Sequence, residues 1–171
     1  MTLKKAIELL IEYNVPNHII EHSYKVAKIV YYIAEELKEI PQLNFNKELT
    51  FYAALLHDIT KYQAILNKGE DHSLTSGELL RKKGYPDIGE IIESHVVLKN
   101  LEYLGFEKEL VFYADKRVMH NKIVSLEERF KDLKVRYGIN DKIDEGFNTA
   151  KRIENKLEKL GIRTNYLHLL N

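Results

Sequence analysis

The sequence predicts an all-α fold, a helical bundle. Apolar residues recur at spacings of three and four along most of the 171-residue chain, no run alternates with a period of two, and polar capping residues stand where the apolar periodicity begins. With only three prolines and eight glycines, no obvious linker divides the chain. We therefore expect a single domain over residues 1–171, with amphipathic helices at its C-terminal end.

The bulk composition narrows the class of protein. Lys plus Arg and Asp plus Glu both number 26, so the formal net charge is zero and no broad nucleic-acid-binding face is expected. The chain has no cysteine, which leaves nitrogen and oxygen ligands for any metal. No apolar run is long enough to cross a bilayer, and the N-terminus is not signal-like. We expect a cytoplasmic protein with no nucleic-acid or membrane partner; its oligomeric state is open.

The first two helices are predicted over residues 3–13 and 17–40. The residues of the first that are expected to face inward are Leu3, Ile7, Leu10 and Ile11. Pro16 ends this helix, because proline disfavours helical geometry in the residue before it, and Asn17 can cap the second helix. The inward stripe of the second helix is His22, Val26, Ile29, Ile33 and Leu37.

A third helix is predicted over residues 47–58, where Asn46 can cap it. The turn after this helix leads through Lys61 into a polar loop at residues 68–71. No helix is predicted between Lys61 and that loop.

Two further helices follow the polar loop. One runs over residues 73–83 and stops at Gly84, and His72 lies directly before its first residue. Pro86 begins the other, whose inward residues are Ile88, Ile91, Ile92 and His95.

The C-terminal part of the chain is predicted to hold three helices, over residues 107–120, 126–137 and 141–160. The first has an apolar face that contains an aspartate and consists of Val111, Ala114, Asp115 and Val118. Ser125 and Glu128 have capping-box spacing, and Asp141 can cap the last helix. The amphipathic stripe of the last helix is Ile143, Phe147, Ala150, Leu157 and Leu160.

Polar residues on the inward faces of the predicted helices are the first indication of function. His57 and Asp58 end an apolar run, and burying two such groups costs several kcal/mol unless each finds a partner. A metal ion would satisfy both, whereas the alternative is a pair that caps one helix and starts the next. Taken singly, an inward histidine is more often a satisfied core residue, and His72 is an ordinary capping residue. The metal reading is favoured because the same chain also places other polar groups on or beside inward faces, namely His22, His72, His95 and Asp115.

The ordered pattern of these residues resembles the HD-domain superfamily of metal-dependent phosphohydrolases, named for its His-Asp doublet. The resemblance spans about residues 18–137, which we expect to be the HD core, with residues 138–171 as a C-terminal helical extension. The segments that carry it are His22-Ser23-Tyr24-Lys25-Val26-Ala27, Ala54-Leu55-Leu56-His57-Asp58-Ile59-Thr60-Lys61, His72-Ser73-Leu74-Thr75-Ser76-Gly77, Ile92-Glu93-Ser94-His95 and Tyr113-Ala114-Asp115-Lys116. One departure is Thr60, where the His-Asp-Ile-Gly subgroup has glycine.

The resemblance implies a dinuclear metal site. In that family the first histidine, the doublet and the last aspartate hold one metal, which implies His22, His57, Asp58 and Asp115. Members with two further histidines bind a second metal, which implies His72 and His95, with Asp58 bridging. The nitrogen and oxygen ligands leave the identity of the divalent ions open among Fe, Mn, Ni, Zn and Co.

Such a site activates water for attack on phosphorus. Two metals about 3.5 to 4 Å apart can share a water or hydroxide, lower its pKa and neutralise phosphoryl charge. We expect Asp58 to orient the nucleophile and Lys61 to meet the substrate's phosphate, so these two are the predicted catalytic residues. The predicted substrate contacts are Lys61, Lys116 and His18, for which the alternative is an ordinary surface position. A weaker candidate is Arg117, and the residues assigned to structure or solvent are His120 and His168.

The leading hypothesis is a metal-dependent phosphohydrolase that acts on a phosphate ester or phosphoanhydride of a nucleotide. Dinucleoside polyphosphates are one option, because symmetrical diadenosine tetraphosphate hydrolases of the same superfamily share the small size and dinuclear pattern. The alternative from another class is a metal-bound nucleotide-binding or sensor module without turnover. Oxygen chemistry at a di-iron pair is a third class, which no feature of this sequence favours.

Overall fold

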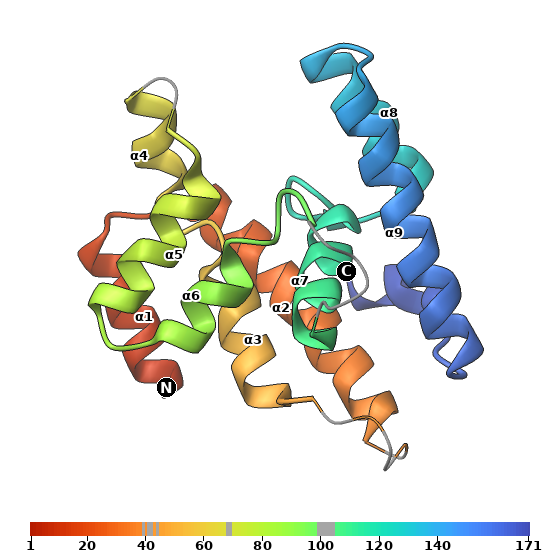
Figure 1. Ribbon diagram of the computed structural model, residues 1–171, viewed down its shortest axis with the longest axis horizontal. Coiled ribbons are helices and arrows are strands. Elements are labelled where there is room, and N and C mark those ends of the chain that lie inside the picture. The colour runs from red at the N-terminus through yellow and green to blue at the C-terminus, as the bar shows by residue number, and fades with distance from the viewer. Residues whose placement is uncertain (39, 41–42, 44, 68–69, 99–104) are drawn as a thin grey trace.

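The computed structural model describes every residue except 39, 41–42, 44, 68–69 and 99–104 (Figure 1). The described residues form α-helices, one short hairpin and one 3-10 helix. The elements are α1 (Leu3–Glu12), α2 (Asn17–Leu37), α3 (Lys47–Leu56), α4 (Lys61–Leu66), α5 (His72–Lys82), α6 (Pro86–Ile92), α7 (Phe106–Lys116), β1 (Val118–Met119), β2 (Lys122–Ile123), α8 (Leu126–Tyr137), α9 (Asp141–Lys159) and η1 (Thr164–Leu170). The prediction of an all-α fold is confirmed.

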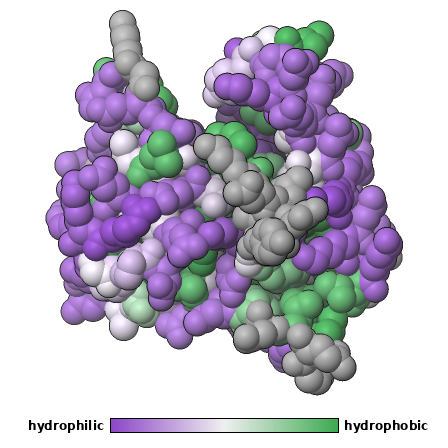
Figure 2. Space-filling model, in the orientation of Figure 1, coloured by the Kyte–Doolittle hydropathy of each residue, from purple (hydrophilic) through white to green (hydrophobic). Residues whose placement is uncertain are grey.

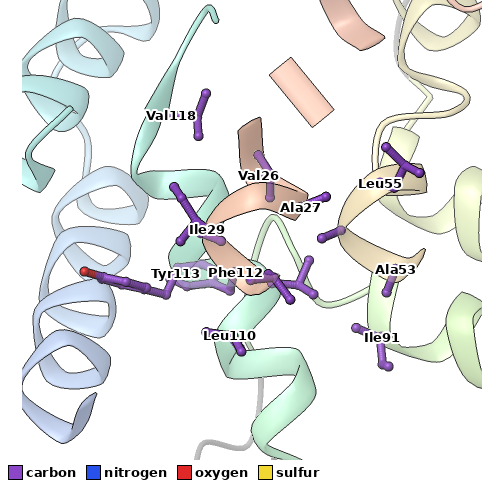
Figure 3. Close-up of a cluster of buried hydrophobic side chains, with 14 of the residues drawn as sticks. Val26, Ala27, Ile29, Ala53, Leu55, Ile91, Leu110, Phe112, Tyr113 and Val118 are labelled. Atoms are coloured by element: carbon purple, nitrogen blue, oxygen red, sulfur yellow. The ribbon is translucent and has the colours of Figure 1, made fainter. Parts of the chain in front are cut away.

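Helix α2 lies at the centre of the bundle. It packs against α3 and α7, while α6, which pairs with α5, packs against α3, and α9 packs against α7 and α8 (Figure 1). Figure 3 shows the core that these contacts enclose, with Val26 and Ile29 of α2 facing Phe112 and Tyr113 of α7. Burial of such side chains is the main stabilising contribution to the fold, and it fixes the helices from which the polar inward residues project.

The inward face of α1 differs from the prediction. Leu10 is buried as expected, but its companions on the core side are Ala6 and Leu9. The other three predicted inward residues are exposed, which are Leu3 (52%), Ile7 (46%) and Ile11 (69%). The spacing correctly indicated a helix, but both of its stripes contain apolar residues, so periodicity alone selected the wrong one.

Two of the predicted caps are confirmed. The side-chain oxygen of Asn46 accepts a hydrogen bond from the Leu49 amide at 3.0 Å and begins α3. At the start of α8, Ser125 and Glu128 form the reciprocal capping box.

Two other predicted caps are wrong by one residue. Pro16 precedes α2, so Asn17 is already its first helical residue and caps nothing. Asn140, not Asp141, accepts from the Ile143 amide at 3.1 Å at the start of α9. The helices themselves begin where the apolar periodicity predicted.

Near the doublet, two boundaries differ from the prediction. Helix α4 forms where a turn and loop were expected, so Lys61 is the first residue of a helix. Helix α6 ends at Ile92, and His95 lies in the turn that follows it. His95 is nevertheless buried, at 2% exposure, and its ring packs edge-on against that of His57, with ring centroids 4.8 Å apart.

The hairpin β1–β2 replaces the end of the predicted helix over residues 107–120. Val118 pairs with Ile123 in an antiparallel register, and His120 takes a left-handed backbone conformation with φ 56° in the two-residue turn. Strands of two residues are too short to show alternation, so the sequence pattern could not reveal this hairpin within the all-α fold.

Helices α5 and α6 cross at two glycines. A Cβ atom added to Gly89 would lie 2.5 Å from the backbone oxygen of Gly77, so only glycine permits this approach. The crossing brings the start of α5, with His72, close to the turn after α6, with His95.

Helix α9 presents a partly buried stripe to the rest of the bundle. Ala150 and Leu157 are buried, and Phe147 stacks edge-on against Phe130 of α8. None of the described helices is long and apolar enough to span a bilayer.

Candidate metal centre

The His57–Asp58 doublet lies directly after α3 and is almost completely buried. His57 is 0% and Asp58 1% exposed. Helix ends leave carbonyl groups without intrahelical partners, and the ring nitrogen Nδ1 of His57 donates to one of them, the carbonyl of Ala54, at 2.7 Å. This bond assigns the proton to Nδ1 and leaves the lone pair of Nε2 directed at Asp58, 3.4 Å from its Oδ2.

Two other imidazoles are oriented in the same way. His22 donates from Nδ1 to the carbonyl of His120 at 2.9 Å, and His95 donates to the carbonyl of Ile92 at 2.6 Å. In each ring Nε2 is therefore the nitrogen whose lone pair could bind a metal ion. Metal-ligating histidines are commonly held through a hydrogen bond of this kind.

The first group of donor atoms gathers between α2, the doublet and α7. His22 Nε2 lies 3.0 Å from Asp115 Oδ1 and 4.0 Å from Asp58 Oδ2, and His57 Nε2 lies 3.7 Å from Asp115 Oδ1. Asp115, at 6% exposure, is buried as its apolar neighbours predicted.

The second group gathers around the other oxygen of Asp58. His72 Nε2 and His95 Nε2 lie 3.3 and 3.5 Å from Asp58 Oδ1 and 3.2 Å from each other. Asp58 is thus shared, with Oδ2 facing the first group and Oδ1 facing the second.

These residues fit a pair of divalent ions. Donor atoms that share one cation at bond lengths of about 2.1 Å lie roughly 3 to 4 Å apart, as they do in both groups. Within the described part of the chain, His57 Nε2 and Asp58 Oδ1 are buried without a hydrogen-bond partner. Orphaned buried acceptors are costly, and a cation in each group would satisfy them.

The charges of the site favour the metal-binding protonation states of both carboxylates. Burial opposes ionisation of Asp58, but the positive charges of His57 and Lys61 outweigh it and hold the pKa of Asp58 well below its usual range. The pKa of Asp115 is lowered in the same way, against burial, by Lys116 and His22.

The buried histidines differ in their proton affinity. Burial lowers the pKa of His95 to about 4, so its ring is neutral. Burial also disfavours the cation of His57, but Asp58 and Asp115 beside it raise its pKa overall. A metal ion in the first group therefore competes with a proton for His57 Nε2.

The predicted lysines occupy different positions. Lys61 Nζ lies 2.6 Å from Asp58 Oδ2, and its side chain is one-third exposed toward a pocket beside the site. Although burial lowers it, the pKa of Lys61 is raised by Asp58 and Asp115. Lys116 is buried and bonds to Asp115 Oδ2 at 2.6 Å and to the carbonyl of His95 at 3.3 Å.

The remaining predicted residues lie around this centre. His18 is exposed in the pocket that Lys61 also lines. Arg117 is buried elsewhere, where it donates to Tyr113, Glu154 and the carbonyl of Val124. His168 is exposed and donates to the carbonyl of its neighbour Asn165 at 2.8 Å.

Sequence reasoning missed three contributors to the site. His120 supplies a backbone carbonyl rather than its side chain, which no sequence pattern reveals. Thr60 bonds to the carbonyl of His72 and to the hydroxyls of Thr75 and Ser76, and so ties the doublet turn to α5. Arg129, the third, is buried and lines the pocket beside Lys61; the capping box indicated its helix but not the pocket that it lines.

Comparison with known proteins identifies the family. The HD domain matches residues 19–133, which is more than half of the chain. No curated protein and no solved structure matches the chain significantly. The match contains every residue of the two donor groups, and their geometry fits the metal-binding chemistry of that family. The chain therefore belongs to the HD domain family, within the superfamily of metal-dependent phosphohydrolases.

Proposed function

We propose that this protein hydrolyses a phosphate ester or phosphoanhydride of a nucleotide at a site that holds two divalent ions. The observation that carries the proposal is the position of Asp58, whose two oxygens face two separate groups of donor atoms. The residues assigned to the first ion are His22, His57, Asp58 and Asp115. Those assigned to the second are His72, His95 and Asp58.

The residues around the two groups prepare them for this role. The Nδ1 hydrogen bonds of His22, His57 and His95 fix each ring so that Nε2 faces inward. Lys116 neutralises the outer oxygen of Asp115 and leaves Oδ1 toward the first group. This arrangement is set before any ligand arrives, which lowers the cost of reorganisation.

The bound ions would supply an activated water and neutralise charge on the phosphoryl oxygens. Lys61 places a positive charge at the open side of the site, because its amine lies beside Asp58 and its side chain reaches the pocket. We assign to it a charge-assisted contact with the phosphate that is attacked. We assign to Lys116 a positioning role rather than a substrate contact, since both of its hydrogen bonds hold groups of the site.

The test is phosphate release from a nucleotide panel by purified protein with Mn or Fe restored. Activity is expected in the parent and should vanish in Asp58→Ala together with bound metal. His168→Ala is the matched control, and should change neither. Equal metal content in Asp58→Ala and the parent would refute the assignment of Asp58, whereas tight nucleotide binding without turnover under any metal would support a sensor module instead.

A further inference from the structure

A pocket of about 400 Å³ opens beside the two donor groups, and Asp58 and His22 form part of its wall. Its volume is typical of a site for a small molecule. The pocket extends from the doublet past Lys61 of α4 to Arg129 and Arg136 of α8. A substrate whose phosphoryl group lies at the doublet therefore has room to extend toward α8.

Arg129 is an unusual residue in the wall of this pocket. It is 8% exposed, its Nη1 donates to Asp132 at 3.1 Å, and its Nε is buried without a hydrogen-bond partner among the described residues. A guanidinium left partly unpaired in the interior is costly, because its donors have been removed from water. An anion in the pocket would complete its hydrogen bonds.

Two arginines in this part of the pocket share a single carboxylate. Asp132 also pairs with Arg136, so one carboxylate serves two guanidinium groups. The other acidic side chain here, Glu21, accepts from the amide of Asn121 at 3.1 Å.

Lys61 adds a further positive charge on the path from the doublet. Its amine lies 2.6 Å from Asp58 Oδ2, and its side chain lines the same pocket as Arg129. An anion that reaches from the doublet toward α8 would therefore pass both cations.

The rim of the pocket is apolar and aromatic. Ile65 of α4 and Tyr137 at the end of α8 both line it and are 63% and 67% exposed. Figure 1 shows α4 and the far end of α8 on opposite sides of the site, and Figure 2 shows the surface notched between them. The pocket thus combines two arginines and a lysine with an apolar rim, which suits the phosphates and the base of a nucleotide.

We propose that Arg129 is a specificity-determining residue that binds a second phosphate, one that adjoins the phosphoryl group attacked at the doublet. This inference rests on the proposed function for the place of the first phosphoryl group. It narrows the substrate class to compounds with at least two linked phosphates, such as nucleoside diphosphates, triphosphates or dinucleoside polyphosphates. Arg129 would present the terminal nitrogens of its guanidinium group to this phosphate. Arg136, two turns along α8, would supply one further contact.

The experiment compares two probes whose P–C bonds are not hydrolysed. Methylenediphosphonate carries two linked phosphonate groups, and methylphosphonate carries one. Binding of each to the metal-loaded protein is measured by calorimetry, with metal content checked after each titration. The parent should bind the diphosphonate at least tenfold more tightly than the monophosphonate. Arg129→Met keeps the aliphatic stem and should lose about 10- to 100-fold in diphosphonate affinity, with little change for the monophosphonate.

A matched control is Arg152→Gln, which removes an exposed arginine of α9 outside the pocket and should leave both affinities unchanged. If Arg129→Met fails to fold, Arg129→Lys replaces it, because this variant keeps the charge but not the fork and should lose several-fold in preference. Equal binding of the two probes by the parent overturns the inference, and so does an unchanged preference in the folded Arg129 variant or an equal loss in Arg152→Gln.

The proposed hydrolase activity is tested separately, by measuring phosphate release from nucleotides. A preference for diphosphonate that depends on Arg129, without turnover of any nucleotide, would support the subsite and contradict the hydrolase. Turnover without such a preference would support the hydrolase and overturn the subsite.

Discussion

The crossing of α5 and α6 makes a quantitative prediction for Gly89→Ala. The added Cβ would lie 2.5 Å from the backbone oxygen of Gly77, about 0.9 Å closer than the 3.4 Å at which ordinary contact begins. Overpacking of this kind costs about 1 to 3 kcal/mol, and a backbone atom cannot rotate away. Alanine regains about 1 kcal/mol of helix propensity, so we expect a net loss of up to about 2 kcal/mol of unfolding free energy.

The same displacement should reach the second donor group. Moving α5 away from α6 by close to 1 Å would separate His72 Nε2 from His95 Nε2, which now lie 3.2 Å apart, beyond the spacing suited to one ion. We therefore expect Gly89→Ala to retain the ion of the first group and to lose that of the second. Urea unfolding measures the free energy, and elemental analysis measures metal per chain.

Gly146→Ala is the matched control for the same chemical change. At this position of α9 the new Cβ would meet only the ring of Phe130, at an ordinary 3.4 Å. We expect a gain of about 0.5 to 1 kcal/mol, with metal content unchanged. The reasoning is refuted if both variants are stabilised alike, or if Gly89→Ala keeps the metal content of the parent.

Three further predictions concern stability. A chelator should lower the thermal midpoint of the parent by about 5 to 10 °C in differential scanning calorimetry, because ions at 100 times their Kd stabilise by about 2.7 kcal/mol; Asp58→Asn should show no such response. Arg117→Ala should lose about 2 to 6 kcal/mol of unfolding free energy in urea, because it leaves the carbonyls of Val124 and Thr164 without their buried donor; a loss below 1 kcal/mol would contradict this. Ser125→Ala should lose about 1 kcal/mol in the same assay through the capping box of α8, and a neutral result would mean that the cap contributes nothing.

Much of the fold could be predicted because its helices are amphipathic and because capping residues mark where several of them begin. The stripe of α2 specified a helix and its buried face correctly, and the capping box at Ser125 specified the start of α8. The α1 stripe failed because Leu3, Ile7 and Ile11 also have helical spacing, and only tertiary packing decides which of two apolar faces is covered.

The side chains of the candidate site could be predicted better than the backbone around them. Asp115 was found because a carboxylate among apolar neighbours needs a cation, and the structure brings it to His22. The carbonyl of His120 could not be found, because every residue has a carbonyl and its direction depends on a left-handed turn in a hairpin of two-residue strands. The assignment of individual residues to metal or substrate stays a prediction.

The imidazoles of His57 and His95 each bond to a carbonyl three residues earlier, at the end of the helix from which they emerge. The length of α3 and of α6 is therefore part of the coordination geometry, since one residue more or less would turn the ring away by about 100°. Insertions or deletions within these two helices should consequently be far more harmful than in the connecting loops. Any redesign of this scaffold for another metal must preserve helix register before it changes a single ligand.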